Sequence, residues 1–485
     1  MGKAQITTVT LAEWVVAAEA LAAGDATLLS LWGADGAVQM ALMDAGHGLR
    51  VLTLPTETTF PSVARHHAPA QRLERTMTDL YGLTPAATPD PRPWLDHGRW
   101  PMRHPLGAKG PVAPEPPYAF LPVEGESLHQ VAVGPVHAGI IEPGHFRFTA
   151  QGETVVRLEQ RLGYTHKGVD ALMLGASLER GAQIAGRVSG DSAVAYQWGF
   201  ARAVETALDA SVPPRATALR AVMAELERLA NHLGDIGAIC NDAAFAMMLA
   251  HCGALREHTL RAVGLAFGHR FCRDCICPGG VARDLTTEGA GALRDLVAEV
   301  RAKFPALVAL YDGTASLQDR TVATGTLSPA LAARFGAGGY VGRASGRDFD
   351  TRRDLPYAPY DRLSFTVPTR AEGDVNARVW VRIHEVEQSL ALLSQLLDTL
   401  PEGPIHAALR APTEPSAALT LTEGFRGDIL IWLAMDASGT ITRCHLRDPS
   451  WFQWPLLEAV IDGNIIADFP LCNKSFNASY SGVDL

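Results

Sequence analysis

The chain has 485 residues, of which 47% are hydrophobic and 19% charged, and its formal net charge is −10. This length allows two or three domains with cores of their own, and the composition is that of a globular protein. The negative charge, without any block of Lys or Arg, argues against a nucleic-acid surface. No apolar run approaches the roughly eighteen residues of a transmembrane helix. The odd number of cysteines, 7 in all, shows no disulfide-like framework and is typical of a reducing cytosol.

The first 85 or so residues predict a small α/β module. Residues 11–23 have apolar side chains at helical spacing, and Thr10 is a plausible N-cap. Residues 48–54 are typical of a strand, and a second helix is predicted over 61–81. The segment 84–121 is rich in proline, which predicts an extended connection between two domains.

The remainder of the chain predicts a mainly helical domain with small β elements. A β-hairpin with a turn at Gln151-Gly152 is expected within 129–156. A C-terminal sheet is expected near 418–445, followed by a last helix near 454–462. Between them, helical spacing predicts six helices, at about 167–182, 189–208, 214–240, 244–270, 287–304 and 376–399.

Two sets of motifs resemble known families. Glu-Arg-Thr-Met-Thr-Asp-Leu-Tyr-Gly-Leu at 74–83, followed by Arg-His-Pro-Leu at 103–106, resembles the 30-kDa subunit of complex I. From residue 134 to the end, the order of motifs resembles a superfamily that contains the 49-kDa subunit of complex I and the large subunits of membrane-bound, group 4-type hydrogenases. Its landmarks begin at Gly134, Glu142, Tyr164, Arg187, Val212, Glu225, Pro278, Arg352 and Leu400. A fusion of both modules in one chain is similar to the formate-hydrogenlyase type.

The segment 187–196, Arg-Val-Ser-Gly-Asp-Ser-Ala-Val-Ala-Tyr, resembles the nickel loop Arg-x-Cys-Gly-x-Cys-x-x-x-His of nickel–iron hydrogenases. Serines replace both cysteines, and Tyr196 replaces the histidine. The tail 477–482, Asn-Ala-Ser-Tyr-Ser-Gly, corresponds to the family's second cysteine pair. Soft thiolates hold nickel and iron, and a serine hydroxyl does not replace them near neutral pH. We therefore expect no metal and no hydrogen turnover. The four lost ligand positions are Ser189, Ser192, Ser479 and Gly482.

A quinone reductase of the complex I type places a tyrosine and a histidine at the quinone headgroup, with an aspartate that orients the histidine. Aligned on Arg187, the tyrosine position is a glycine, and the loop that carries His145 has the hydrogenase sequence Glu-Pro-Gly-His. Asp242 falls at the position of the orienting aspartate. The resemblance leaves quinone binding open, with His145 or Tyr196 as candidate contacts in a different headgroup pose.

Three polar residues have a structural and a functional interpretation. Glu142 is either a solvated turn residue or, as the resemblance implies, a proton relay. Arg187 is either a surface residue or faces the iron–sulfur cluster of a partner, whose potential it would raise. Asp191 either caps a helix or adds a carboxylate to the emptied metal cavity. We expect these three and Asp242 to bound one polar cavity, in which at least one carboxylate has a raised pKa.

The segment Cys272-Arg-Asp-Cys275-Ile-Cys277 has the spacing of a metal site, which leaves zinc or an iron–sulfur cluster open. No second Cys-x-x-Cys exists, which favours free thiols. In the resembled family, the position of Cys272 is a histidine near the last iron–sulfur cluster, so Cys272 is a candidate neighbour of a partner's cluster.

These observations predict an α+β fold, with a 30-kDa-like domain and proline-rich strap over 1–120 and a hydrogenase-large-subunit-like domain over 121–485. The resemblance implies a metal-free subunit of a membrane-associated redox complex that binds no cofactor itself. Its expected partners are an iron–sulfur small subunit, a ferredoxin-like iron–sulfur subunit and antiporter-like and quinone-module-like membrane subunits. We expect a peripheral position on the cytoplasmic side of the inner membrane, because the N-terminus lacks a signal peptide. The alternatives are a quinone-reducing subunit with a rearranged site and a purely structural scaffold.

Overall fold

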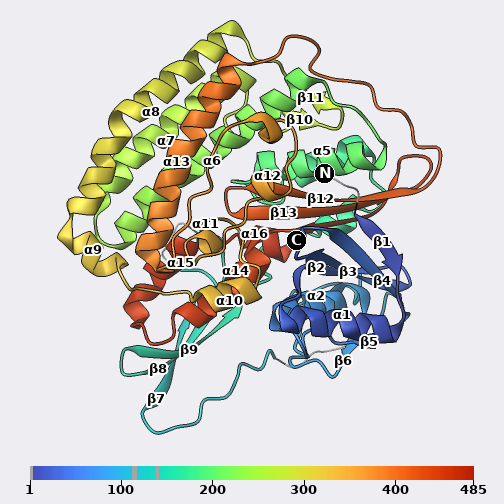
Figure 1. Cartoon of the computed structure of the whole chain (residues 1–485). Helices are drawn as coiled ribbons and strands as arrows, with labels where there is room; N and C mark the ends of the chain where they lie inside the picture. The colour runs from blue at the N-terminus through green and yellow to red at the C-terminus, as the bar shows by residue number, and fades with distance from the viewer. Residues whose placement is uncertain (1–3, 112–116, 138–140) are drawn as a thin grey trace.

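The computed structural model describes residues 4–111, 117–137 and 141–485. The N-terminal module, residues 4–86, contains a four-stranded sheet of order β1-β4-β3-β2 with two helices (Figure 1). The Thr10 side chain accepts a hydrogen bond from the Glu13 N–H, and Glu13 accepts one from the Thr10 N–H at 2.7 Å, which confirms the predicted N-cap. The elements are β1 (Gln5–Thr8), α1 (Leu11–Ala23), β2 (Ala26–Ala34), β3 (Ala37–Asp44), β4 (Leu49–Pro55) and α2 (Gln71–Tyr81).

The second helix of the N-terminal module is shorter than predicted. A 3₁₀ turn over Ala68–Ala70 precedes α2, which begins at Gln71. The preceding segment is held by the buried carboxylate of Glu74, which accepts hydrogen bonds from the Val63 N–H at 2.6 Å and the Ser62 hydroxyl at 2.8 Å. Because these bonds fix an irregular backbone, the helix does not extend back to 61. Two short parallel strands, β5 (Thr59–Pro61) and β6 (Thr84–Ala86), flank the helix.

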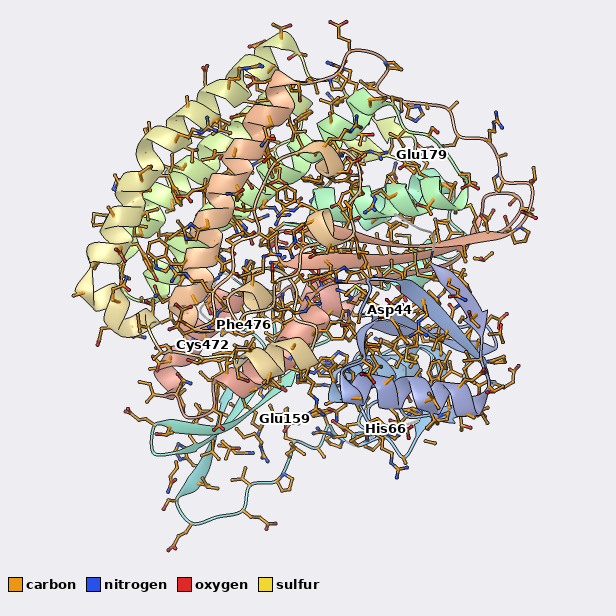
Figure 2. The ribbon with its side chains drawn as sticks, viewed as in Figure 1. Asp44, His66, Glu159, Glu179, Cys472 and Phe476 are labelled. Carbon is orange, nitrogen blue, oxygen red and sulfur yellow. The ribbon has the colours of Figure 1, made fainter. Side chains whose placement is uncertain are left out.

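The proline-rich strap that follows is bound to the rest of the chain by arginine side chains. Arg75 donates to Asp90 at 3.0 Å, and Arg92 donates to Glu159 at 2.5 Å. Glu159, labelled in Figure 2, also accepts the Leu121 N–H at 2.8 Å. The Arg75–Asp90 pair connects the described part of the strap to α2, and the Arg92–Glu159 pair connects it to a strand over 154–161.

The predicted hairpin is part of a three-stranded antiparallel sheet. The sheet contains β7 (Leu128–Val133), β8 (His145–Gln151) and β9 (Thr154–Arg161) in that order. The turn at Gln151-Gly152 connects β8 to β9, and Gly152 has a φ of 59°, which favours glycine. The predicted turn at Gln151-Gly152 is therefore confirmed.

Four long helices form a bundle at one side of the molecule (Figure 1): α6 (Pro214–Asp242), α7 (Ala246–Phe267), α8 (Thr287–Gly313) and α13 (Val375–Asp398). These helices confirm four of the six predicted helices, although α8 continues past its predicted end at 304 with Pro305 inside it. The helix predicted over 167–182 is instead two, α3 (Val169–Met173) and α4 (Leu178–Ala185), separated at Gly175 with a φ of 77°. Helix α5 (Ala193–Ala207) begins four residues later than predicted.

The C-terminal sheet is antiparallel and contains β12 (Ser416–Gly424), β13 (Gly427–Met435) and β14 (Ile441–Arg447). One face covers α5, and the sheet also packs against the N-terminal module (Figure 1). The His445 ring stacks on Trp32 with centroids 4.9 Å apart and hydrogen-bonds to the Ser30 hydroxyl at 2.8 Å. The predicted last helix is α14 (Ser450–Val460), and α15 (Phe469–Phe476) and α16 (Ser481–Asp484) follow it.

The remaining elements are short: β10 (Ile276–Cys277), β11 (Gly280–Val281), α9 (Ala315–Thr321), α10 (Pro329–Arg334), α11 (Gly339–Arg343), α12 (Thr351–Asp354) and two 3₁₀ turns at Tyr360–Arg362 and Ile466–Asp468. The predicted fold class, a small α/β module followed by a mainly helical region with minor sheets, is confirmed. Within the described ranges, every helix is too short or too polar to cross a bilayer.

Candidate functional site

The loop before α5 meets the C-terminal tail, residues 477–485, in the interior of the protein. The hydroxyls of Ser189 and Ser479 are hydrogen-bonded at 2.9 Å although 290 residues separate them in sequence. The Gly482 N–H donates to the Ser479 hydroxyl at 3.0 Å, and the Ser192 hydroxyl lies 3.4 Å from the Asp191 carboxylate. The four positions that the resemblance assigns to lost metal ligands therefore converge on one small region.

An ion pair lies beside these four positions. Arg426, in the turn between β12 and β13, donates both terminal nitrogens to the two carboxylate oxygens of Asp191, at 2.6 and 2.5 Å. Arg426 also donates to the Asn477 carbonyl, which connects the ion pair to the tail. Burial alone would raise the pKa of Asp191, but the Arg426 guanidinium holds that pKa below its usual value. Asp191 is therefore ionised at neutral pH.

The residues at this site do not fit a nickel–iron centre. Three of the four positions present hydroxyls, which are hard oxygen donors that hold their protons near pH 7, whereas such a centre takes thiolates. The fourth, Gly482, has no side chain, and a Cβ there would lie 2.8 Å from the Asp448 carboxylate and 2.9 Å from the Ser479 hydroxyl. Neighbouring groups therefore occupy the space that a ligand side chain from this position would need.

Tyr196 is part of the core and does not face an open cavity. Its ring is fully buried, and its hydroxyl donates to Asp448 at 2.8 Å. Burial raises the pKa of Tyr196 well above its usual value, so the hydroxyl retains its proton. Trp198, two residues further on α5, is also buried and packs edge-on against Tyr357 with centroids 5.3 Å apart.

Glu142 is an exposed residue whose carboxylate contacts the C-terminal tail. Its carboxylate accepts the Ser481 N–H at 3.0 Å, two residues along the chain from Ser479. The ammonium of Lys167, which is attracted to Glu142, donates to the Arg187 and Val188 carbonyls at 3.0 and 2.6 Å. Glu142 is thus connected to both the tail and the loop before α5.

Arg187 and Asp242 do not share a cavity with Asp191, so the prediction of one pocket bounded by all four residues is wrong. Arg187 forms a bidentate ion pair with Asp274, at 2.7 Å for both bonds, and the two side chains are 43% and 44% exposed. Asn231 of α6 donates to the Asp191 carbonyl at 2.7 Å. Asp242 is eleven residues further along α6, about 16 Å away at the helical rise. Burial raises the pKa of Asp242, against the opposing charge of Lys474.

His145 lies on β8, with Nδ1 bonded to the Gly134 carbonyl at 3.2 Å and its ring against Phe120. Its Nε2 is buried and has no hydrogen-bond partner within the described residues, so Asp242 does not orient it. Burial lowers the pKa of His145, which keeps the imidazole neutral at pH 7.

Glu227 is a polar residue of this site that the sequence analysis missed. Its two carboxylate oxygens accept the Val194 and Ala195 N–H groups, at 2.7 and 3.1 Å, and so satisfy the exposed amides at the start of α5. Burial raises the pKa of Glu227 to about 8. Glu227 could have been identified from the sequence, because it lies four residues before Asn231 and therefore on the same face of α6. Glu227, Asp191 and Cys272 line a cavity of about 30 Å³, which has room for one or two waters.

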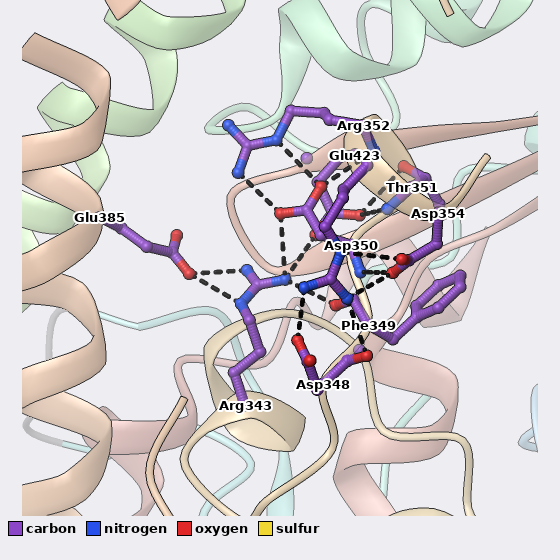
Figure 3. Close-up of polar contacts among 12 residues, drawn as sticks. Arg343, Asp348, Phe349, Asp350, Thr351, Arg352, Asp354, Glu385 and Glu423 are labelled. Carbon is purple, nitrogen blue, oxygen red and sulfur yellow. Dashed lines mark hydrogen bonds and ion pairs between the residues drawn. The ribbon is translucent and has the colours of Figure 1, made fainter. Parts of the chain in front are cut away.

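A buried ionic network lies between the helical bundle and β12 (Figure 3). Arg343 donates to Glu385 at 2.6 Å and to Glu423 at 3.0 Å, and all three side chains are 1% exposed. Arg352 extends the network by donating to Asp350 and Glu225 at 2.7 and 2.9 Å. At its other end, the His232 ring lies 2.7 Å from the Glu385 carboxylate. Because Arg352 and Glu225 lie in two of the sequence landmarks, those landmarks mark structural ion pairs in this chain.

All seven cysteines are free. The Cys275 thiol donates to the Phe267 and Arg273 carbonyls at 3.6 and 3.7 Å. Within the ranges that the structure describes, no group of three or more His, Cys, Asp or Glu side chains is arranged to hold a metal ion.

Comparison with known proteins identifies two families within the chain. Residues 235–420 and 410–485 match the 49 Kd subunit of respiratory-chain NADH dehydrogenase, and residues 7–115 match its 30 Kd subunit. Formate hydrogenlyase subunit 5 of Escherichia coli K12 is 31% identical over 450 residues, which are 90% of this chain and 79% of that protein. Hydrogenase-4 component G of the same organism is 31% identical over 88% of this chain and 76% of its own length. An NADH-quinone oxidoreductase subunit of Syntrophobacter fumaroxidans is 29% identical over 73% of this chain and 95% of its own length.

Proposed function

The chain belongs to the family of the 49 Kd subunit of respiratory-chain NADH dehydrogenase, and we propose that it is a hydrogenase-like large subunit without a metal centre, in a membrane-associated redox complex. The observation that carries this proposal is the convergence of Ser189, Ser192, Ser479 and Gly482 beside the Asp191–Arg426 ion pair. The frame of a ligand site is retained, whereas its donor atoms are hydroxyls or missing. The chain therefore contributes charge and proton chemistry but binds no cofactor.

In the proposed complex, an iron–sulfur small subunit packs beside this chain and supplies the redox centre. Arg187, on an exposed surface next to the loop before α5, is the residue that we place opposite the partner's cluster, with Cys272 behind it. A ferredoxin-like iron–sulfur subunit would carry electrons to the small subunit. Antiporter-like and quinone-module-like subunits would lie in the membrane beneath, which places the complex at the cytoplasmic side of the inner membrane.

The proposed role of this chain is to couple electron transfer to proton or ion movement. Glu142 suits a proton relay because its carboxylate lies between the C-terminal tail and Lys167, next to the former ligand position Ser479. The cavity at Asp191, about 30 Å³, is far smaller than the roughly 300 Å³ of a small-molecule site. We therefore place no quinone headgroup there. A quinone contact at His145 would need a separate site.

The structure also favours a second candidate, a scaffold that retains the shape without the chemistry. Tyr196 and Trp198 fill the space along α5, and the Asp191–Arg426 ion pair neutralises the charges beside the former ligand positions. A scaffold would need no proton relay, so the two candidates differ in whether Glu142 titrates during turnover.

Affinity purification of the tagged chain from its native host tests the proposed function. We expect an iron–sulfur small subunit and membrane subunits to copurify in stoichiometric amounts, with a reducible iron–sulfur signal in electron paramagnetic resonance. Recovery of the chain without any iron–sulfur protein would contradict both the proposed complex and the scaffold alternative.

A further inference from the structure

A tight turn connects the two cysteines of the Cys-x-x-Cys segment. The Cys275 N–H donates to the Cys272 carbonyl at 3.1 Å, which closes a four-residue β-turn. Within it, Cys272 has a φ of 47° and Asp274 a φ of 60°, and the left-handed region is uncommon for residues other than glycine. Two such residues in one turn persist only where the surroundings fix the backbone.

The surroundings of this turn do fix it. Gln197, a fully buried residue of α5, donates from its amide to the Cys272 carbonyl at 3.2 Å and accepts the Ile276 N–H at 3.4 Å. The Ala282 N–H donates to the Cys275 carbonyl at 2.9 Å. Both ends of the turn are therefore anchored, and a β-turn keeps its first and fourth Cα atoms within about 7 Å, close to the separation that a disulfide spans.

The thiol pair is also chemically asymmetric. The hydrogen bond from Cys272 raises the pKa of the Cys272 thiol and lowers that of Cys275, and Arg283 adds positive charge near Cys275. The thiolate is the nucleophilic form of cysteine, so a pair that shares one proton is more reactive than two isolated buried thiols. By contrast, burial raises the pKa of Cys240 and of Cys252 to about 12.

Access to the pair is restricted by size. Both cysteines are 2% exposed, and Cys272 lines the cavity of about 30 Å³ beside Asp191 and Glu227. This cavity has room for a water or a peroxide, but not for a tripeptide disulfide such as oxidised glutathione.

We propose that Cys272 and Cys275 form a reversible dithiol–disulfide pair that is oxidised by a small peroxide. The thiolate sulfur attacks one peroxide oxygen, the O–O bond breaks, and the released hydroxide takes a proton to form water. The resulting sulfenic acid is attacked by the second sulfur, an S–S bond forms, and the sulfenic oxygen leaves with the second thiol's proton as another water. Two thiols and one hydrogen peroxide thus give one disulfide and two waters.

Oxidation would change the surface that carries Arg187. An S–S bond is about 2.05 Å long, which is shorter than any contact between two separate thiols, so the turn must adjust when the bond forms. Asp274 lies between the two cysteines and forms the bidentate pair with Arg187. The disulfide therefore alters the Arg187–Asp274 pair. This inference does not depend on the identity of the partner subunits.

The test uses the purified full chain or its native complex, treated with a stoichiometric amount of hydrogen peroxide and then alkylated under denaturing conditions. Peptide mass spectrometry should show a Cys272–Cys275 disulfide, with a mass lower by two hydrogens, that dithiothreitol reverses. Cys272→Ser and Cys275→Ser should each abolish this product, whereas Cys277→Ser should retain it as the matched control.

The readout on the wild-type chain needs no variant, so a folding defect in a variant does not decide the test. Two unmodified thiols after peroxide treatment would overturn the proposal. Irreversible sulfinic acid at either position, or a disulfide that joins Cys277 instead, would also overturn it.

Discussion

Neutral replacements of Asp191 and Arg426 should each destabilise the protein, and the effects of the two replacements should not be additive. Arg426 is 4% exposed, and removal of one partner from a fully buried pair costs about 3–5 kcal/mol. Asp191 is 34% exposed, toward the cavity, so water offsets part of that cost. We expect Asp191→Asn and Arg426→Met to lower the free energy of unfolding by about 1–3 kcal/mol each, with a coupling energy of about 1–2 kcal/mol in the double variant.

The assay is urea unfolding of the full chain, followed by tryptophan fluorescence, for the two single variants and the double variant. The depressed pKa of Asp191 means that the pair stabilises the folded state above the ordinary aspartate pKa near 4, and that this contribution is lost as pH falls through the lower folded value. The matched control is the exposed Arg187–Asp274 pair, whose coupling should stay below about 1 kcal/mol. A coupling at Asp191–Arg426 no larger than the control's would refute the reasoning.

Three further predictions concern single charged side chains. Glu142→Gln should leave the complex assembled but lower its redox-coupled turnover about tenfold or more, and an unchanged rate would favour the scaffold candidate. For Glu227, burial raises the folded pKa to about 8, so the folded protein binds a proton that the unfolded chain loses. The unfolding free energy of the wild type relative to Glu227→Gln should therefore fall, by about 3–4 kcal/mol, as pH rises from about 5 to about 8; a rise would contradict this assignment. Arg343→Met removes the cation shared by Glu385 and other buried carboxylates and should cost about 3–5 kcal/mol in urea unfolding. The control is Arg294→Met, at an ion pair whose side chains are 50% and 70% exposed, which should change stability by less than about 0.5 kcal/mol. If Arg343→Met and Arg294→Met destabilise the protein equally, the structural role of Arg343 is refuted.

Long helices with regular apolar spacing were predictable from the sequence. The apolar spacing of α6 and α13 predicted both helices within about two residues of their bounds. The antiparallel strands β2 and β3 were missed because they are buried on both faces, so their apolar residues do not alternate with polar ones. The break between α3 and α4 was missed because apolar residues continue at helical spacing across Gly175.

The candidate site was predictable where a motif fixes local spacing. Ser189 and Ser192 were identified from the loop before α5, and the structure brings both to the C-terminal tail. The partner of Asp191 was not predictable, because Arg426 is 235 residues away and nothing in its own segment marks it as a counter-ion. Arg187 was expected to bound the cavity, but its guanidinium forms an ion pair with Asp274 at the surface. Long-range charge pairing, which depends on tertiary packing, accounts for both differences.

Metal analysis of the native complex tests the central claim most directly, namely that a hydroxyl-lined site with an ion pair has replaced a nickel–iron centre. The complex should be purified through the tagged chain without chelators and analysed by inductively coupled plasma mass spectrometry, with its subunits quantified in parallel. We predict iron in proportion to the iron–sulfur subunits and nickel far below one atom per chain. One nickel per chain that is lost on replacement of Ser189 and Ser192 by alanine would contradict the account.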